Sequence, residues 1–183
     1  MYDRLLVRIA KNLEKAKIPY MVMGGLAILQ YGEFRATKDI DITLGLGIDG
    51  FSQVLQFIED CRLKSLVRSP KEFVQQTYVL PVEDKKTGIR VDLILSNTLF
   101  EHQAIKRATR IKIGYQIVRF ASVEDLVIQK IIAGRPRDLE DVSKMLMKNV
   151  KLNVRYVKQW LGKFEQTLDM SFVNRFVRIL EGK

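Results

Sequence analysis

The chain has a single cysteine, Cys61, and a single histidine, His102, among its 183 residues. One thiol excludes an internal disulfide and leaves no second cysteine for CxxC redox chemistry. One cysteine and one histidine also exclude a zinc cluster built from these two residue types. Any metal ion that the chain binds must therefore take oxygen ligands.

Long hydrophobic runs are also missing. No uninterrupted apolar segment is long enough to cross a bilayer, and the stretch MYDRLLVRIAKNLEKAKIP has an amphipathic helical pattern without a signal-peptide cleavage region. We therefore expect a soluble, cytoplasmic protein with no membrane partner. At 183 residues and 47% hydrophobic, the chain is long enough for one core with a helical appendage and short for two independent domains.

Acidic residues are fewer than basic ones, 21 against 31, which gives a formal net charge of +10. Residues 1–100 hold 14 basic and 12 acidic residues, and residues 101–183 hold 17 and 9, so the two parts carry +2 and +8. A basic second half suits a polyanion such as RNA or DNA, or an acidic protein. A solvated helical surface explains the same charge equally well.

Strand and helix patterns alternate up to about residue 121. Period-two or continuous apolar patterns predict strands at 20–23, 39–44, 72–81 and 88–96, and a hairpin over 110–121 bent at Gly114. Helical patterns fill most of the intervals, including a helix that Asn97 caps, and only helices follow Ser122. This order predicts an α/β or α+β core over 1–121 and a helical region over 122–183, with a soft boundary.

The segment RATKDIDITL, residues 35–44, places two aspartates in an apolar strand pattern. Ile40, Ile42 and Leu44 alternate as in a buried strand, so Asp39 and Asp41 lie on the other face, about 7 Å apart along the chain. Two like charges this close repel each other. A neighbouring cation, most simply a divalent metal ion, would compensate that repulsion.

Asp92 adds a third strand aspartate in GIRVDLILS. Val91, Leu93 and Leu95 alternate to one side, which puts Asp92 on the other side together with Arg90. Alone, Asp92 would be a surface residue or an ion-pair partner of Arg90. Together with Asp39 and Asp41 it predicts a hard-oxygen site for Mg²⁺ or Mn²⁺ with room for phosphate oxygens and water.

Glycines occur at two strand-to-helix junctions. Gly24 and Gly25 would allow close approach to a phosphate, although a tight turn also requires glycine. GLGIDG, residues 45–50, matches the dinucleotide pattern G-x-G-x-x-G, but the aspartates in the preceding strand and the lack of a well-placed acid downstream disfavour that interpretation. No P-loop sequence is present.

Several features together resemble the nucleotidyltransferase superfamily of the polymerase-beta type. These are MGGLAILQYGEFRATKDIDITL, the later VDLI, and EDLVIQKIIAGRPRDLEDV with a helical lysine and an Arg-Asp pair. The resemblance runs from Met21 to Val142 and is greatest to small uncharacterised members and AbiEii-type toxins. It implies an α+β fold with a mixed twisted sheet flanked by helices and a C-terminal helical region.

The resemblance also implies roles for individual residues. Asp39 and Asp41 would hold two divalent ions, Mg²⁺ or Mn²⁺, and Asp92 would join at the ion nearer the acceptor and help to deprotonate its hydroxyl. Gly24 and Gly25 would cradle the β- and γ-phosphates of an NTP. Further nucleotide or phosphate contacts would come from residues that also have plain structural explanations: Arg35, Thr37, Lys130, Arg137 and Asp138.

The implied reaction transfers a nucleoside monophosphate from an NTP to a hydroxyl of RNA (including tRNA), a protein or a small molecule, with release of pyrophosphate. The chain departs from the pattern at Gly25, where many members have serine, and full-length toxin relatives are usually longer. A toxin held by an antitoxin-like partner is one alternative. A catalytically silent NTP-binding or nucleic-acid-binding module of the same fold is another.

Overall fold

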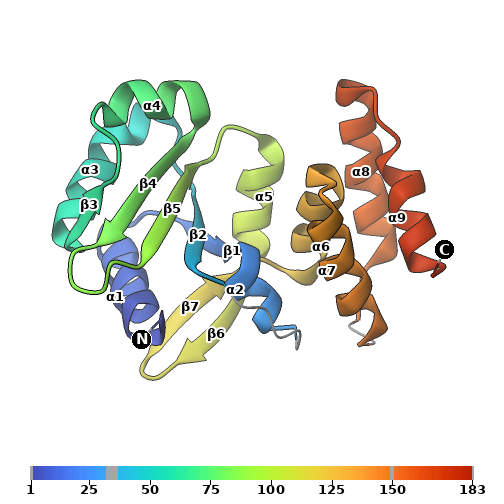
Figure 1. The fold of residues 1–183 in the computed structure, drawn as a ribbon, viewed down its shortest axis with the longest axis horizontal. Helices are drawn as coiled ribbons and strands as arrows, with labels where there is room; N and C mark the ends of the chain where they lie inside the picture. The colour runs from blue at the N-terminus through green and yellow to red at the C-terminus, as the bar shows by residue number, and fades with distance from the viewer. Residues whose placement is uncertain (1, 32–36, 149–150, 183) are drawn as a thin grey trace. The chain divides into compact units, whose positions relative to one another are not determined.

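The computed structural model describes residues 2–31, 37–148 and 151–182 (Figure 1). By internal contacts the chain divides into two compact units. The first comprises Met1–Leu26 and Ala36–Ala121, and the second comprises Ala27–Arg35 and Ser122–Lys183. Residues 27–31 therefore group with the C-terminal helices.

The first unit is built on a sheet whose order, within the described residues, is β3-β4-β5-β2-β1-β7-β6. The pairs β2–β5 and β1–β7 are parallel and the other pairs are antiparallel, so the sheet is mixed. This confirms the expected fold class. The strands are β1 Tyr20–Met23, β2 Asp39–Leu44, β3 Leu63–Ser65, β4 Val79–Asp84, β5 Arg90–Leu95, β6 Thr109–Ile113 and β7 Gln116–Phe120.

The two faces of this sheet differ sharply. One face, which we call the apolar face, carries fully buried side chains from the central strands: Val22, Ile40, Ile42, Leu44, Val91, Leu93 and Phe120. Because side chains alternate along a strand, Asp39, Asp41 and Asp92 lie on the opposite face, which we call the aspartate face. Burial of the apolar side chains fixes the register, since a one-residue slip would exchange the two faces.

Helices flank this sheet, and the first of them packs on the apolar face. They are α1 Tyr2–Lys15, α2 Gly24–Leu29, α3 Phe51–Asp60, α4 Pro70–Thr77 and α5 Leu99–Arg107, with a short 3₁₀ turn at Ile48–Gly50. α1 packs against β7 and α3. Two side-chain contacts fix α1 on the apolar face: Arg8 pairs with Asp84 of β4, and Gln116 of β7 donates to Glu14 at 2.7 Å.

Two local sequence predictions were wrong. Residues 72–77, expected to begin a strand, form α4, because Pro70 favours the first helical turn; Tyr78 then ends the helix in the left-handed region at φ +58°. Asn97 does not cap α5. Thr98 does, accepting a hydrogen bond from the Glu101 amide at 3.2 Å while the Glu101 carboxylate accepts from the Thr98 amide at 3.0 Å.

The second unit contains the helices that were expected after Ser122: α6 Val123–Ala133, α7 Pro136–Met147, α8 Val154–Leu168 and α9 Phe172–Leu180. Ser122 caps α6, and Gly134 ends it at φ +63°. The fully buried Asp125 accepts a hydrogen bond from the Tyr156 hydroxyl at 2.8 Å, which ties α8 to α6. None of the helices in the described ranges has the length and apolar character needed to span a membrane.

Candidate active site

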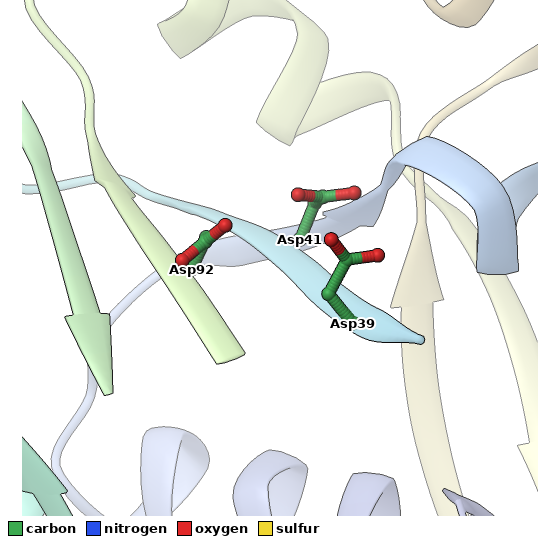
Figure 2. A group of neighbouring side chains, drawn as sticks. All are labelled: Asp39, Asp41 and Asp92. Carbon is green, nitrogen blue, oxygen red and sulfur yellow. The ribbon is translucent and has the colours of Figure 1, made fainter. Parts of the chain in front are cut away.

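Three carboxylates converge on the aspartate face (Figure 2). Asp39 and Asp41 come from β2 and Asp92 from the neighbouring β5, and one ligand oxygen from each lies within 4.8 Å of the others. Asp41 and Asp92 are directly opposite in the parallel ladder, and Asp39 is opposite Arg90. The sheet register thus brings together the three aspartates that the sequence singled out.

The carboxylates are held by neighbours on the same face. The Thr37 hydroxyl lies 3.1 Å from Asp39 Oδ1 and 3.0 Å from its carbonyl oxygen, which orients Asp39 at the start of β2. Arg90 Nε donates to Asp92 Oδ1 at 2.9 Å. All three aspartates are partly exposed, so solvent and a ligand can reach them.

An ion pair links Arg90 to the cluster, with its Nε 2.9 Å from Asp92 Oδ1. Its hydrogen bond to Asp92, that carboxylate's charge, and the charges of Asp39 and Asp41 all raise the pKa of the guanidinium. The side chain is about half exposed, at 54%. Arg90 therefore offsets part of the negative charge of the cluster.

Residue 24 must be a glycine because the Asp41 carboxylate lies against its backbone. A Cβ atom at Gly24 would lie 1.9 Å from Asp41 Oδ2, and the residue has φ +61°, a conformation that favours glycine. Gly25, the next residue of α2, is buried. Gly24 thus has a steric role beside the carboxylates, which the turn interpretation alone did not foresee.

The donor set fits a hard divalent cation. Three carboxylate oxygens at this spacing, partly exposed and without sulfur or nitrogen donors, are what Mg²⁺ and Mn²⁺ accept, with remaining positions open to water and phosphate oxygens. A larger all-protein cage would be expected for Ca²⁺. The arrangement can therefore hold a metal ion and still admit a phosphate-bearing substrate.

Other predicted residues lie in different places. Arg35 is outside the described residues, so its predicted phosphate contact has no structural description here. Thr37 is at the cluster, where its hydroxyl donates a hydrogen bond to Asp39. In the GLGIDG segment, Gly45 donates its amide to the Pro19 carbonyl at 2.6 Å, and Gly47 precedes the 3₁₀ turn. That glycine pattern therefore shapes a packed junction.

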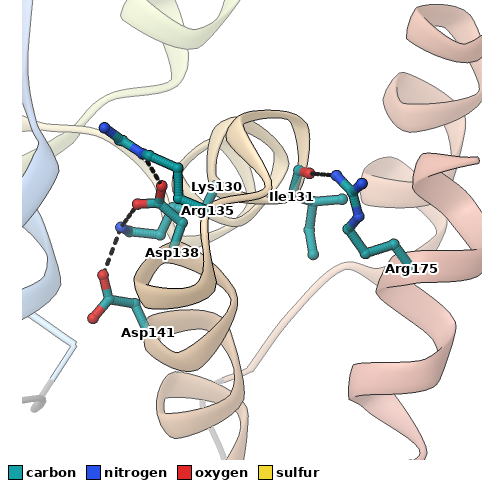
Figure 3. A network of polar contacts seen from close by, with 6 residues as sticks. All are labelled: Lys130, Ile131, Arg135, Asp138, Asp141 and Arg175. Carbon is teal, nitrogen blue, oxygen red and sulfur yellow. Dashed lines mark hydrogen bonds and ion pairs between the residues drawn. The ribbon is translucent and has the colours of Figure 1, made fainter. Parts of the chain in front are cut away.

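Lys130, Arg137 and Asp138 lie in the helical unit. Lys130 is 5% exposed, and its ammonium donates to Asp138 at 3.0 Å and to Asp141 at 2.7 Å (Figure 3). Arg135 Nε donates to the other oxygen of Asp138 at 2.5 Å. Arg137 is exposed on α7. The lysine that sequence reasoning placed on the triphosphate is thus held between two aspartates of α7.

Burial and hydrogen bonding act in opposite directions on Asp138. Burial alone raises the pKa of this carboxyl, but hydrogen bonds from Arg135 and Lys130, together with their charges, lower it below the usual range. Sequence reasoning did not give Asp141 its part in this network. The available signal was spacing, since Asp138 and Asp141 are three residues apart and so lie on one face of α7.

Solved structures with the same fold include several nucleotidyltransferases. The antibiotic-resistance factor ANT(2'')-Ia is 16% identical, with 91% of this chain and 92% of that chain covered and a TM-score of 0.62. A nucleotidyltransferase-like antigenic protein from Paracoccidioides brasiliensis is 17% identical over 99% and 92% of the chains, with a TM-score of 0.59. The lincosamide adenylyltransferase LnuA is 16% identical over 78% and 94%, with a TM-score of 0.51.

The sequence itself identifies the family. No protein with a curated functional assignment matches the chain. The profile of the family described as "Nucleotidyltransferase of unknown function (DUF6036)" matches residues 3–177, which is almost the whole chain. This agrees with the resemblance in the sequence and with the fold. The chain therefore belongs to this nucleotidyltransferase family.

Proposed function

We propose that this protein transfers a nucleoside monophosphate from an NTP to a hydroxyl acceptor and releases pyrophosphate, with Asp39, Asp41 and Asp92 as the catalytic, metal-holding residues. The observation that carries the proposal is the convergence of three carboxylate oxygens within 4.8 Å on one face of the sheet. Membership of the nucleotidyltransferase family supports the same chemistry.

The proposed roles follow from position. Asp39 and Asp41 would hold two divalent ions, Mg²⁺ or Mn²⁺, and Asp92 would share the ion on the acceptor side. When bound, such ions activate an attacking hydroxyl and neutralise the charge that develops on the leaving group. Arg90 donates a hydrogen bond to the Asp92 carboxylate, which orients this group but also competes with an ion for it. The Thr37 hydroxyl orients Asp39 through a hydrogen bond.

The reaction forms one bond and breaks one. The acceptor oxygen attacks the α-phosphorus in line with the bridging oxygen to the β-phosphorus, and that bridging bond breaks to release pyrophosphate. The hydroxyl proton passes to Asp92 or to water. Gly24 and Gly25 are the proposed contacts of the β- and γ-phosphates, and Gly24 leaves the Asp41 carboxylate in place because it has no side chain.

We propose more limited roles for Lys130, Arg137 and Asp138, the residues of the helical unit that were predicted to contact the nucleotide. Lys130 and Asp138 act as a pair, since Asp138 already shares the Lys130 ammonium with Asp141. The exposed Arg137 is better placed on its helix to meet a triphosphate or an acceptor than the buried Lys130. ANT(2")-Ia has been solved with adenylyl-2"-tobramycin, so ATP is the first donor to test.

The test is label transfer. The purified protein is incubated with Mg²⁺ or Mn²⁺, each α-labelled NTP in turn, and RNA, protein extract or small hydroxyl compounds as acceptors. We expect label transfer by the wild type and its loss in both Asp39→Ala and Asp41→Ala. The control variants Glu59→Ala and Glu72→Ala, which remove exposed carboxylates from helices, should transfer label as the wild type does. If the aspartate variants keep metal-dependent NTP binding and transfer, the proposed site is wrong. NTP binding by the wild type without transfer to any acceptor would favour the catalytically silent module.

A further inference from the structure

The β6–β7 hairpin carries its positive charge on the aspartate face. Met23 is paired with Asp41, so Met21 and Met23 of β1 lie on that face, and Val22 lies on the other. Val22 is opposite Phe120 of β7, which places Arg119 on the aspartate face. Arg119 is in turn opposite Arg110 of β6, and Lys112 follows Arg110 by two residues. We call Arg110, Lys112 and Arg119 the hairpin cations.

The hairpin cations form a like-charge cluster. Arg110 and Arg119 are directly opposite each other in the antiparallel ladder, where Cβ atoms are about 4.5–5.5 Å apart and like charges destabilise the pair. Arg110 and Lys112 are exposed and Arg119 is half-buried. Their side chains have no hydrogen bond or ion pair to any residue that the structure describes. An anion would relieve this repulsion.

The remaining residues between the two charge clusters are neutral. From Asp41 the sheet runs through β1, with Met21 and Met23 on this face, to Arg119 and Ile117 of β7. Neighbouring strands are about 4.8 Å apart, and β7 and β6 are three and four strands from β5, which carries Asp92, so they lie about 14 and 19 Å from it. The aspartate face thus has a carboxylate cluster and a cationic end, with Met23 partly exposed between them and Met21 fully buried.

The geometry points to a single-stranded nucleic acid as the acceptor, with its terminal hydroxyl at Asp92 and its upstream phosphates on the hairpin cations. This inference rests on the proposed transfer to a hydroxyl. One strand of a stacked helix presents a phosphate about every 3.4 Å, so roughly four to six phosphates span the separation of about 14–19 Å. The partly exposed Met23 between the clusters offers an apolar contact to an unpaired base.

Charge argues against a cationic small molecule at this end of the face. Such an acceptor would meet three positive side chains without an acidic partner on β6 or β7 of this face, where the remaining side chain is Ile117. An acidic polypeptide meets the same cations but lacks the regular phosphate spacing and the stacking bases. These two possibilities are therefore outcomes that the experiment separates.

The experiment measures strand binding as a function of salt. The probes are a short 5'-labelled RNA, the same sequence as DNA, and a polyglutamate of equal charge, each followed by fluorescence anisotropy without NTP. The test variant is Arg110→Gln/Lys112→Gln/Arg119→Gln. Its matched control is Arg4→Gln/Lys11→Gln/Lys15→Gln, which removes the same charge from exposed positions of α1 on the apolar face. Urea unfolding shows that both variants fold.

For single strands, log affinity falls with log salt with a slope of about −0.7 for each phosphate contact. Three contacts add about −2 to the slope, so a fourfold rise in salt should weaken the wild type about twentyfold more than the hairpin variant. The control should keep the wild-type slope. If the triple variant unfolds, Arg110→Gln and Lys112→Gln, at exposed positions, should each reduce the slope by about 0.7.

Three results would overturn the inference: an unchanged slope in the hairpin variants, equal binding of polyglutamate, or a loss of NTP affinity in place of strand affinity. Comparing the affinities of the RNA and DNA probes shows which of the two nucleic acids is the preferred acceptor. Because binding is read without turnover, failure of label transfer counts against the proposed function alone, and the hairpin result stands separately.

Discussion

Gly24 and Asp41 occupy the same small volume at the end of β1: a Cβ atom on Gly24 would lie 1.9 Å from Asp41 Oδ2. The carboxylate therefore takes its position because residue 24 has no side chain. Since Asp41 is opposite Asp92 in the sheet, any shift of Asp41 opens the carboxylate cluster. The glycine is thus part of the candidate site although it supplies no ligand atom.

Gly24→Ala should reduce metal affinity as well as stability. The left-handed backbone at φ +61° costs an alanine about 1–2 kcal/mol, and the displaced Asp41 should lower Mn²⁺ affinity by about tenfold or more. Gly88→Ala is the matched control, because Gly88 has φ +68° and no atom within 4 Å of its Cβ position. Urea unfolding and Mn²⁺ titration measure the two effects. Equal Mn²⁺ affinities in both variants would contradict this account.

Arg90→Gln should strengthen divalent metal binding. Arg90 competes for Asp92 and places a positive charge beside the cluster, so its removal should favour the bound ion by about 1 kcal/mol, or about fivefold in affinity. Lys64→Gln is a suitable control, since Lys64 also carries a cation on this face but pairs with Glu83 at 2.7 Å. Calorimetric titration with Mn²⁺ tests both, and weaker binding by Arg90→Gln would show that the guanidinium supports the metal site.

Local sequence patterns were enough to predict part of this site. The alternation of residues in DIDITL predicted that Asp39 and Asp41 lie on one face of the sheet. The same argument predicted that Asp92 and its neighbour Val91 point to different faces. The pattern could not show that β2 and β5 are neighbours in register, because strand pairing depends on contacts between distant segments. Family resemblance supplied that link, and it holds in the structure.

The hairpin shows the same limit more clearly. Its strands and the bend at Gly114 were predicted from RIKIGYQIVRFA, and Gly114 has φ +61°. That Arg119 lies on the face of Asp41 follows only from the parallel pair β1–β7, which joins residues about 100 positions apart. The α4 error has a local cause instead: β-forming residues in FVQQTYVL outweighed the helix-starting Pro70.

Lys130→Met should destabilise the helical unit strongly. The change leaves the buried carboxylates of Asp138 and Asp141 without the shared ammonium, and breaking a buried ion pair costs about 3–5 kcal/mol. Lys144→Met, which removes an exposed pair with Glu140 on α7, should change the unfolding free energy little. Urea unfolding compares them. Adding Asp138→Asn and Asp141→Asn to Lys130→Met should recover part of the loss, and no recovery would contradict a charge-based cause.

Stability should fall in acid, in part through Asp138. Burial raises the pKa of this carboxyl, but hydrogen bonds from Arg135 and Lys130 outweigh it and hold the pKa below the unfolded value of about 3.9. The unfolded chain therefore binds the proton more readily, so this contribution is full above the unfolded pKa and is lost as the pH falls through the folded pKa. Urea unfolding at a series of pH values should show a shallower decline for Asp138→Asn. An unchanged slope would refute the assignment.

Cys61 should be inert in the folded protein. Its side chain is fully buried, and burial raises the pKa of the thiol to about 11, against a smaller opposing effect of Arg8. With an unfolded pKa of about 8.5, the unfolded chain loses the proton first, so this thiol removes stability as the pH rises above that value. At about pH 8 a disulfide reagent should react at least about a hundredfold more slowly with the native protein than with the urea-unfolded chain. Cys61→Ala, which has no thiol, gives the background signal. If the native protein reacted as fast as the unfolded chain, the segment around Cys61 would have to open readily.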